Sequence, residues 1–216
     1  MIRLITSDVY VGDAIGNFSF QLRDFFLRNG IECQLYARYY DASSNLGVRD
    51  FDQFFDEINP DDIVFAQFSI YEPGNERYSE LSNKKIVYYH GITPPHYFSG
   101  IDHETEENCT KGRQQYHCFK GFDYYLANSQ FMLDELIEDV SAGDATIVAQ
   151  MKMHSSVMPP TLEPYQWQGI KPEAMDFPLA ENNFICVGRL APHKKIEDVI
   201  DWFYAYTALG SDSSLV

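Results

Sequence analysis

The sequence lacks the short motifs that mark the commonest enzyme classes. Its 216 residues contain no Walker phosphate loop, no HExxH and no GxSxG, which argues against a P-loop NTPase, a zincin and an α/β-hydrolase. The four cysteines show no CxxC spacing. One segment brings cysteine and histidine together, at His103, Cys109, His117 and Cys118. That spacing fits no common zinc finger or ribbon, so we expect neither a metal nor a cofactor.

Positive charge is scarce. The chain has 16 Lys and Arg against 32 Asp and Glu, a formal net charge of −16. A field of this sign repels phosphate backbones and anionic lipid headgroups, so no nucleic-acid partner is expected. Long apolar runs are missing too, because none reaches the roughly 18 residues of a membrane helix. With no signal-peptide pattern at the N-terminus, we expect no transmembrane segment and a cytoplasmic location.

What the sequence does contain is an alternation of strand and helix patterns. Apolar runs of strand length occur at residues 2–6, 31–37, 63–66, 85–90 and 123–127. Apolar residues at helical spacing lie between or after them, at residues 18–30, 51–58 and 131–137, with N-cap residue types at Asn17 and at Asn128-Ser129. Such alternation predicts an α/β fold, a Rossmann-like parallel sheet with helices on both faces.

A change of pattern near residue 160 indicates a second domain. Residues 161–182 are rich in Pro, Gly and Gln, and residues 183–216 hold one strand, one turn and one helix before a further strand begins. One strand and one helix cannot bury their apolar faces alone. We therefore predict a first domain over 1–160, a linker over 161–182 and the truncated start of a second Rossmann-like domain over 183–216. The exposed face of its helix favours self-association or packing on the first domain.

Two features of the first domain are candidates for chemistry. Gly12 and Gly16 lie in the loop between the first strand and the first helix, where open parallel sheets bind ligands and a helix N-terminus offers N–H groups to an anion. A tight turn without a ligand explains the same two glycines. His90 ends a buried strand at the same edge of the sheet, although a lone histidine is more often a core or surface residue.

The second domain contributes a basic constellation. Arg189 and Lys194 follow a strand and precede a helix, so both cations can converge over that helix's N-terminus. Arginine offers a planar fork to phosphate oxygens and lysine a mobile point charge, and together they would stabilise a departing diphosphate. The alternative is a solvated basic turn, which the acidity of the rest of the chain makes less attractive.

These segments together resemble the retaining family-4 glycosyltransferases of GT-B fold. Val187-Gly188-Arg189-Leu190-Ala191-Pro192-His193-Lys194 is similar to the family's G-R-L-x-P-x-K signature, except that Lys195 follows where the family often has Gly. Gly12-Asp13-Ala14-Ile15-Gly16-Asn17, Tyr89-His90-Gly91-Ile92-Thr93-Pro94-Pro95, Ala127-Asn128-Ser129-Gln130-Phe131 and Met158-Pro159-Pro160 resemble further landmarks, in the family's order.

The resemblance implies transfer of a sugar, with retention, from a nucleotide-diphosphate-sugar to a glycan or lipid-linked acceptor. By it, Arg189, Lys194, Gly12 and Gly16 bind the donor diphosphate without a metal, and His90 is catalytic, in contact with the transferred sugar. Asp13, Asn17 and Ser129 would line the cleft on the acceptor side. The family's E-x7-E segment would lie beyond residue 216, so this chain alone is expected to be inactive.

Two other interpretations stay open. The chain could be a non-catalytic acceptor-binding or scaffolding half that needs a partner to supply the donor domain, although such a half has no need of Arg189 and Lys194. A Rossmann-type oxidoreductase is weaker, because the loop at 12–17 lacks the G-x-G-x-x-G order and the ribose-binding acid expected about 20 residues on is not evident, although Glu32 could be assigned to it.

Overall fold

The computed structural model describes residues 1–160, 169–171, 180–210 and 212–215. The chain forms two compact units, which we call the sheet unit (Met1–Pro94 and Glu107–Leu162) and the small unit (Pro95–Glu106 and Glu163–Val216). Most of the predicted linker, residues 161–182, lies outside the described residues.

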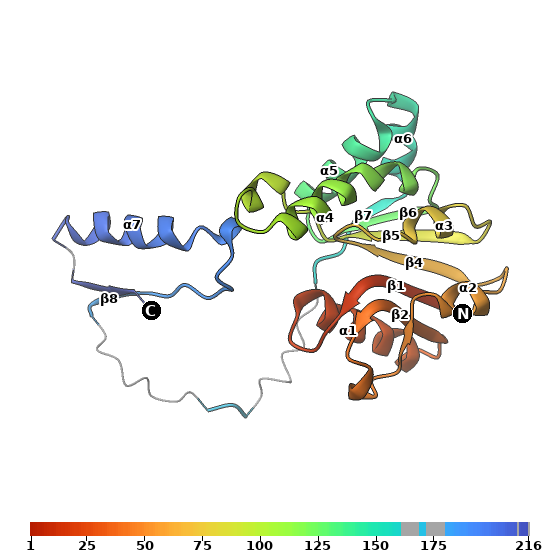
Figure 1. Cartoon of the computed structure of the whole chain (residues 1–216), viewed down its shortest axis with the longest axis horizontal. Coiled ribbons are helices and arrows are strands. Elements are labelled where there is room, and N and C mark those ends of the chain that lie inside the picture. Colours follow the sequence, from red (N-terminus) through yellow and green to blue (C-terminus); the bar gives the residue numbers. More distant parts are fainter. Residues whose placement is uncertain (161–168, 172–179, 211, 216) are drawn as a thin grey trace. The chain divides into compact units, whose positions relative to one another are not determined.

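Seven parallel strands form the sheet unit's core, in the order β3-β2-β1-β4-β5-β6-β7 (Figure 1). The strands are β1 (Ile2–Val9), β2 (Cys33–Tyr40), β3 (Val48–Asp50), β4 (Ile63–Phe68), β5 (Lys84–Tyr89), β6 (Tyr124–Ala127) and β7 (Ser155–Val157). The helices that connect them are α1 (Ala14–Arg28), η1 (Ala42–Ser44), α2 (Gln53–Glu57), α3 (Asn75–Ser79), α4 (His103–Gln114, which begins in the small unit), η3 (Gln115–Phe119), α5 (Gln130–Ser141) and α6 (Ala145–Met153). The predicted α/β fold with a Rossmann-like parallel sheet is confirmed.

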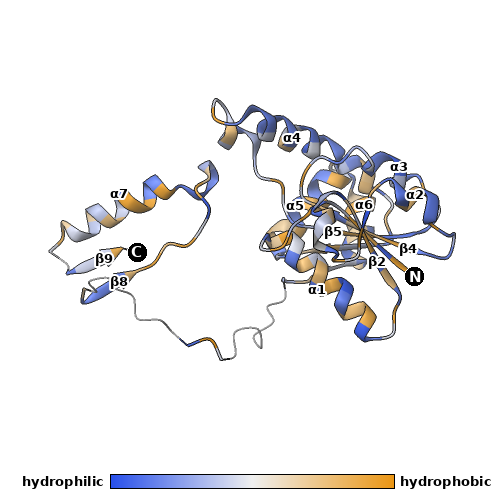
Figure 2. Ribbon diagram, turned by 60° about the horizontal axis from the view of Figure 1, so that its bottom comes forward, coloured by the Kyte–Doolittle hydropathy of each residue, from blue (hydrophilic) through white to orange (hydrophobic). Residues whose placement is uncertain are grey.

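Helices cover both faces of this sheet. Successive side chains of a strand point to opposite faces, and the neighbours Tyr88 and Tyr89 of β5 show this directly. The ring of Tyr88 stacks on Phe18 of α1 at 4.6 Å, whereas Tyr89 packs against Tyr116 of η3 at 5.8 Å. Both tyrosines are fully buried. Hydrophobic residues, orange in Figure 2, accordingly gather in the middle of the sheet unit.

The strand order places a topological switch point beside β1. From β1 the chain builds outward through β2 and β3, then returns to β4 on the other side of β1 and continues to β7. Connections that leave two adjacent parallel strands in opposite directions diverge and leave a crevice at the carboxyl ends of those strands. The loops after β1 and β4 therefore border the natural ligand position of the sheet unit.

The first helix begins earlier than the sequence predicted. Asn17 was expected to be its N-cap, but α1 starts at Ala14 and Asp13 is the capping residue. Both residue types cap well. Asp13 takes this role because its carboxylate accepts from two backbone N–H groups of the first turn, whereas Asn17 lies inside the helix. Ser129, by contrast, is the N-cap of α5 as predicted.

The small unit is a single β-α-β element with short 3-10 turns. Its elements are η2 (Pro95–Phe98), β8 (Asn182–Phe184), η5 (Pro192–Lys194), α7 (Ile196–Thr207) and β9 (Ser213–Leu215), and β8 pairs with β9 in parallel. No residue of α7 is buried. Its apolar residues line, with β8 and β9, an open hollow of about 420 Å³. No helix among the described residues has the length and apolarity to cross a membrane.

Candidate functional site

The loop after β1 holds most of the predicted residues of the sheet unit. Oδ2 of Asp13 accepts hydrogen bonds from the backbone N–H groups of Ile15, at 3.0 Å, and of Gly16, at 3.3 Å. The side chain of Asn17 reaches back, and its Oδ1 accepts from the N–H of Gly12 at 3.1 Å. The N–H groups predicted to meet phosphate are thus already bound by side chains, which an incoming anion would have to displace.

The two glycines of this loop are there for different structural reasons. A Cβ on Gly16 would lie 2.0 Å from the backbone oxygen of Tyr10, so only glycine lets α1 start this close to the end of β1. Gly12 has a φ of +88° and open space around the position of a Cβ, so its requirement is conformational. Backbone geometry explains both glycines, and their spacing alone is no phosphate signal.

His90 follows β5 and lies half-buried at the carboxyl edge of the sheet. Its ring contacts Phe18 edge-on at 5.4 Å and Tyr88 at 4.6 Å. Its Nε2 lies 3.0 Å from Oε1 of Gln67 in β4, and its backbone carbonyl accepts from Nδ2 of Asn128 at 3.0 Å. The position of His90 is therefore fixed by side chains from α1, from β4 and from the residue that follows β6.

Burial lowers the pKa of His90 to about 4, and the negative charge of Asp13 opposes that shift only in part. The imidazole is therefore neutral at physiological pH. A neutral imidazole offers one N–H donor and one acceptor lone pair. His90 is thus equipped to bind a hydroxyl group, and it supplies no cation for a phosphate.

Two buried residues that the sequence did not point to extend this network. Nε2 of Gln67 lies 2.8 Å from Oγ of Ser19 in α1, and that Oγ lies 2.7 Å from the backbone oxygen of Ile15. Gln67 is 5% exposed and Ser19 is fully buried. The signal available in the sequence was that Gln67 is the single polar residue of the apolar strand Ile63–Phe68. A buried amide needs hydrogen-bond partners, so its presence there indicated a polar contact.

A third residue, Asp8, was not singled out by the sequence, which predicted a first strand over residues 2–6, whereas β1 extends to Val9 and includes Asp8. It is half-buried near the end of β1. Burial raises the pKa of its carboxyl group, and the charges of Asp13 and Glu72 raise it further. Glu72 is bound by the guanidinium of Arg38 at 2.7 Å, whereas Asp8 has no ion-pair partner in the described part of the chain. A carboxyl group with a raised pKa at a switch point is a candidate for contact with substrate.

Ser129 lies at the end of β6, beside Asn128. Its Oγ accepts from the N–H of Met132 at 3.3 Å, which is the N-cap bond of α5. The side chain therefore has a structural role at this edge of the sheet. Its hydroxyl hydrogen has no bond within the described residues, so a contact to substrate remains compatible with the cap.

The basic constellation belongs to the small unit. Arg189 and Lys194 are exposed, and within residues 180–210 neither forms an ion pair or a hydrogen bond through its side chain. Burial, Lys194 and Arg189 all lower the pKa of His193, which indicates that the two cations lie close to this ring. Lys195 begins α7 in the left-handed conformation, with a φ of 53°. Convergence of the two cations over the N-terminus of α7 stays a prediction.

Metal ligands do not gather in the part of the chain that the structure describes, where no three His, Cys, Asp or Glu side chains form a group. Of the cysteine and histidine segment, Cys118 and His117 contact each other, with Sγ 3.6 Å from Nε2. Cys109 and Cys118 are buried.

Comparison with known proteins gives likeness of structure only. No protein-family model and no curated protein matches the sequence. Among solved structures, an alpha-glucosyltransferase in complex with UDP and a 13-mer DNA containing a HMU base matches with a TM-score of 0.55 and 15% identity. An alpha-glucosyltransferase (AGT) in complex with UDP matches with a TM-score of 0.54 and 16% identity.

Both matches cover 99% of this chain and 56% and 57% of the other chain. The chain therefore spans little more than half the length of the structures that it matches. At this level of identity the likeness shows the fold, which is one found in glycosyltransferases.

Proposed function

We propose that the chain belongs to a glycosyltransferase that moves a sugar, with retention, from a nucleotide-diphosphate-sugar to a glycan or lipid-linked acceptor. The observation that carries the proposal is the likeness in fold to UDP-bound alpha-glucosyltransferases over 99% of the chain. The switch-point cluster around His90 and the free cations Arg189 and Lys194 support it, since they supply chemistry for a sugar and for a diphosphate.

Arg189 and Lys194 would bind the donor diphosphate. Charge-assisted hydrogen bonds from arginine to phosphate oxygens are about twice as strong as neutral ones, and a lysine adds charge without fixed geometry. Both side chains are exposed and without partners in the described residues, so ligand binding breaks no existing ion pair. With two cations in place, we expect leaving-group stabilisation without a metal.

The sheet unit would hold the transferred sugar and border the acceptor. His90 is neutral and lies half-buried at the carboxyl edge of the sheet, where one of its ring nitrogens would meet a sugar hydroxyl. Gly12 and Gly16 would border the donor phosphates through their backbone, and Asp13, Asn17 and Ser129 would line the acceptor side. Asp8 joins this group as a carboxyl whose ionisation its surroundings disfavour, a suitable acceptor for a substrate hydroxyl hydrogen.

The acceptor class rests on the charge of the chain. A net charge of −16 disfavours a polyanionic acceptor, so we propose a glycan or a lipid-linked acceptor, even though one matched glucosyltransferase is bound to DNA. A non-catalytic acceptor-binding half is the alternative, and it predicts no affinity for nucleoside diphosphates.

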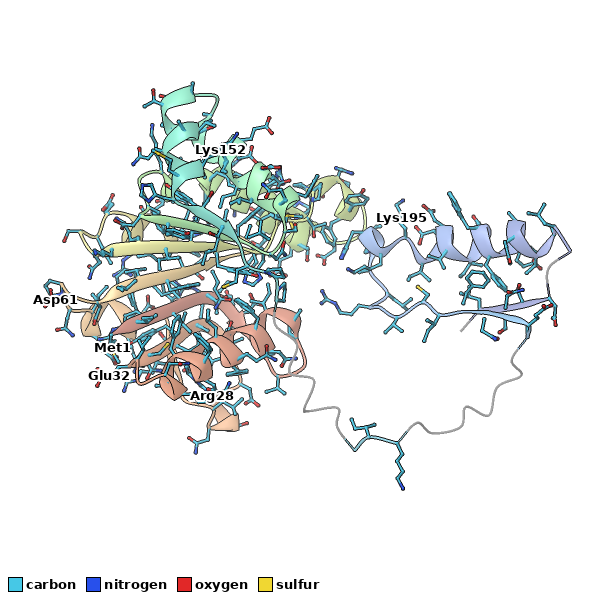
Figure 3. The ribbon with its side chains drawn as sticks, turned by 180° about the vertical axis from the view of Figure 1, so that it is seen from behind. Met1, Arg28, Glu32, Asp61, Lys152 and Lys195 are labelled. Atoms are coloured by element: carbon cyan, nitrogen blue, oxygen red, sulfur yellow. The ribbon has the colours of Figure 1, made fainter. Side chains whose placement is uncertain are left out.

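Calorimetric titration with UDP, GDP and ADP and their sugar conjugates tests the proposal. We expect one nucleotide to bind, and Arg189→Ala or Lys194→Ala to weaken it about tenfold or more, since a hydrogen bond to a charged group contributes roughly 1.5–3 kcal/mol. Lys152→Ala, which removes an exposed cation of the sheet unit (labelled in Figure 3), should leave affinity unchanged. Equal affinity in all variants would refute the diphosphate role, and no binding by the unmodified chain would favour the non-catalytic alternative.

A further inference from the structure

The geometry points to Gln67 as the positioning residue that holds His90 in the tautomer protonated on Nε2, so that Nδ1 accepts a hydrogen bond from a substrate hydroxyl. The first half of this inference concerns the protein alone. The second half, the hydroxyl, rests on the function proposed above and names the chemical group that His90 would recognise.

The assignment of protons begins at Ser19. A serine hydroxyl has one hydrogen to donate and two lone pairs that accept. Oγ of Ser19 lies 2.7 Å from the backbone oxygen of Ile15, closer than either terminal atom of the Gln67 amide, at 2.8 and 3.2 Å, whichever of the two is the oxygen. The hydroxyl hydrogen therefore points along α1 to Ile15, and Ser19 faces Gln67 as an acceptor.

This orientation decides which way the amide of Gln67 is turned. Since Ser19 accepts, the group 2.8 Å away must be the NH₂ of Gln67. The amide oxygen then points the other way, toward His90, whose Nε2 lies 3.0 Å from it. A carbonyl oxygen only accepts, so Nε2 of His90 must carry the hydrogen. Burial of Gln67 and Ser19, at 5% and 0% exposure, keeps water from offering the amide other partners.

The other ring nitrogen is left open. The ring is neutral near pH 7, because burial lowers its pKa, so with hydrogen on Nε2 the Nδ1 atom carries a lone pair. Within the described residues Nδ1 has no hydrogen-bond partner, and this atom is not fully shielded from solvent. Nδ1 is thus an acceptor that solvent reaches.

A ligand atom that meets Nδ1 must donate a hydrogen bond. Sugar hydroxyls donate, whereas phosphate oxygens at neutral pH accept. The tautomer therefore selects for the sugar over the diphosphate at this position. Because Ser19 belongs to α1, the hydrogen-bonded series from His90 through Gln67 to Ser19 also ties the orientation of the ring to the helix that begins just after Gly12 and Asp13.

Ring ¹⁵N spectra of the full chain test the tautomer without any ligand. In the unmodified protein we expect Nε2 of His90 to be protonated and Nδ1 to be unprotonated from pH 6 to pH 8. Gln67→Leu should convert this to a mixture of tautomers. Gln67→Glu keeps an acceptor at the same place, so it should preserve the tautomer and raise the pKa of His90 from about 4 toward its usual range.

Gln34→Leu is the matched control, since Gln34 lies in β2 and bonds the backbone oxygens of Leu35 and Gly47; it should leave the His90 spectrum unchanged. Hydrogen on Nδ1 in the unmodified chain, or an unchanged tautomer in Gln67→Leu together with an unchanged pKa in Gln67→Glu, would overturn the inference. If Gln67→Leu does not fold, the pKa of His90 in Gln67→Glu decides the matter.

Addition of the nucleotide sugar that binds separates the two proposals. A hydroxyl of the transferred sugar bound at Nδ1 should shift that resonance toward its hydrogen-bonded position, and the same nucleoside diphosphate without the transferred sugar should not. Failure of every nucleotide to bind would refute the proposed function and leave the ligand-free tautomer result standing. Binding with no shift at Nδ1 would refute the hydroxyl contact alone.

Discussion

The sheet unit and the small unit use the same building pattern with opposite results. Each contains parallel strands joined by an amphipathic helix, yet Tyr36, Phe68 and Tyr88 of the sheet unit are fully buried, while Trp202 of α7 remains 78% exposed. The difference lies in the number of partners, because seven strands with helices on both faces cover one another and two strands with one helix cannot. An amphipathic pattern thus predicts which face of a helix or strand is apolar, and the neighbouring elements determine whether that face is buried.

The two units also differ in how their functional side chains are held. In the sheet unit, His90, Gln67 and Ser19 form a hydrogen-bonded series that fixes each side chain. In the small unit, Arg189 and Lys194 have no such support within the described residues. A fixed hydrogen-bonding site and exposed cations suit different tasks, namely the recognition of a hydroxyl and the capture of a charged group.

The largest effect is expected from Asp62→Ala, which breaks the most connected ion pair of the sheet unit. Asp62 accepts from Nε of Arg3 at 2.8 Å and from the amino terminus at 3.0 Å, and both side chains of the Arg3–Asp62 pair are 6% exposed. Removal of the carboxylate leaves the buried Arg3 with only the longer ion pair to Glu57, at 3.6 Å, and the loss of one partner of a buried ion pair typically costs about 3–5 kcal/mol. Neighbouring Asp61→Ala, exposed at the same edge of the sheet as Met1 (Figure 3), should change stability by less than about 0.5 kcal/mol.

The loss of stability is measured by urea unfolding, with amide exchange in β1 and β4 as the signal. Tryptophan fluorescence does not report on the sheet unit, because both tryptophans lie outside it.

Asp62 also makes the stability of the sheet unit depend on pH. Burial would raise the pKa of Asp62, but hydrogen bonds from Asn59, the amino terminus and Arg3 outweigh it and lower the pKa to about 2. The stability from this lowered pKa is present above the ordinary value of 3.8 and is lost as the pH falls toward about 2. Equal acid sensitivity of Asp62→Ala and the unmodified chain would contradict this.

A smaller loss, of about 1–3 kcal/mol, is expected from Gly16→Ala. The added Cβ would meet the backbone oxygen of Tyr10 at 2.0 Å, so α1 must move away from β1. Gly12→Ala is the control, since it meets no atom and suffers only from its φ of +88°, at about 1 kcal/mol. Equal melting temperatures for the two variants would mean that α1 is not closely packed here, and the His90 tautomer would then be expected to survive as well.

The sequence predicted the central strands and long helices well, because their apolar patterns are long. It missed β3 (Val48–Asp50) and α3 (Asn75–Ser79), which are too short to show a period, and α6, of which only Met151 is buried. For α1 the sequence predicted Asn17 as the N-cap, whereas Asp13 caps the helix; both residue types cap well, so residue type alone does not separate them.

The candidate site divides in the same way. His90 and Arg189 lie within recognisable local segments, so the sequence could point to them. The sequence did not point to Gln67, Ser19 and Asp8. They come near the site because the ends of β1, β4 and β5 lie side by side, and local sequence patterns do not reveal that strand order. The family that the sequence resembles often has glycine where this chain has Lys195. The positive φ of Lys195 explains that preference, because glycine adopts such a φ more easily.

A change confined to association is expected from Trp202→Lys. Trp202 lines the apolar hollow of the small unit, and self-association through this unit stays a prediction of its exposed face. Sedimentation velocity should show less self-association in Trp202→Lys, with the unfolding of the sheet unit unaltered. Asp201→Asn raises the net charge by the same one unit on the same exposed helix and should not dissociate the protein. Association equal in all three chains would contradict a role for this face.

The smallest effect, a gain of at most about 1 kcal/mol, is expected from Lys195→Gly. Lys195 has φ 53° and ψ 46° at the N-cap of α7, with no side-chain cap; Figure 3 labels it at the start of this helix. A side chain in this conformation costs roughly 1–2 kcal/mol, and the added freedom of glycine in the unfolded chain offsets part of the relief. Slower amide exchange across α7 in Lys195→Gly would show the gain. Lys195→Ala removes the same charge but keeps the Cβ, so it should not slow exchange. If it does so equally, repulsion among Arg189, Lys194 and Lys195 and not backbone conformation limits the stability of the helix, and the three cations act as one group.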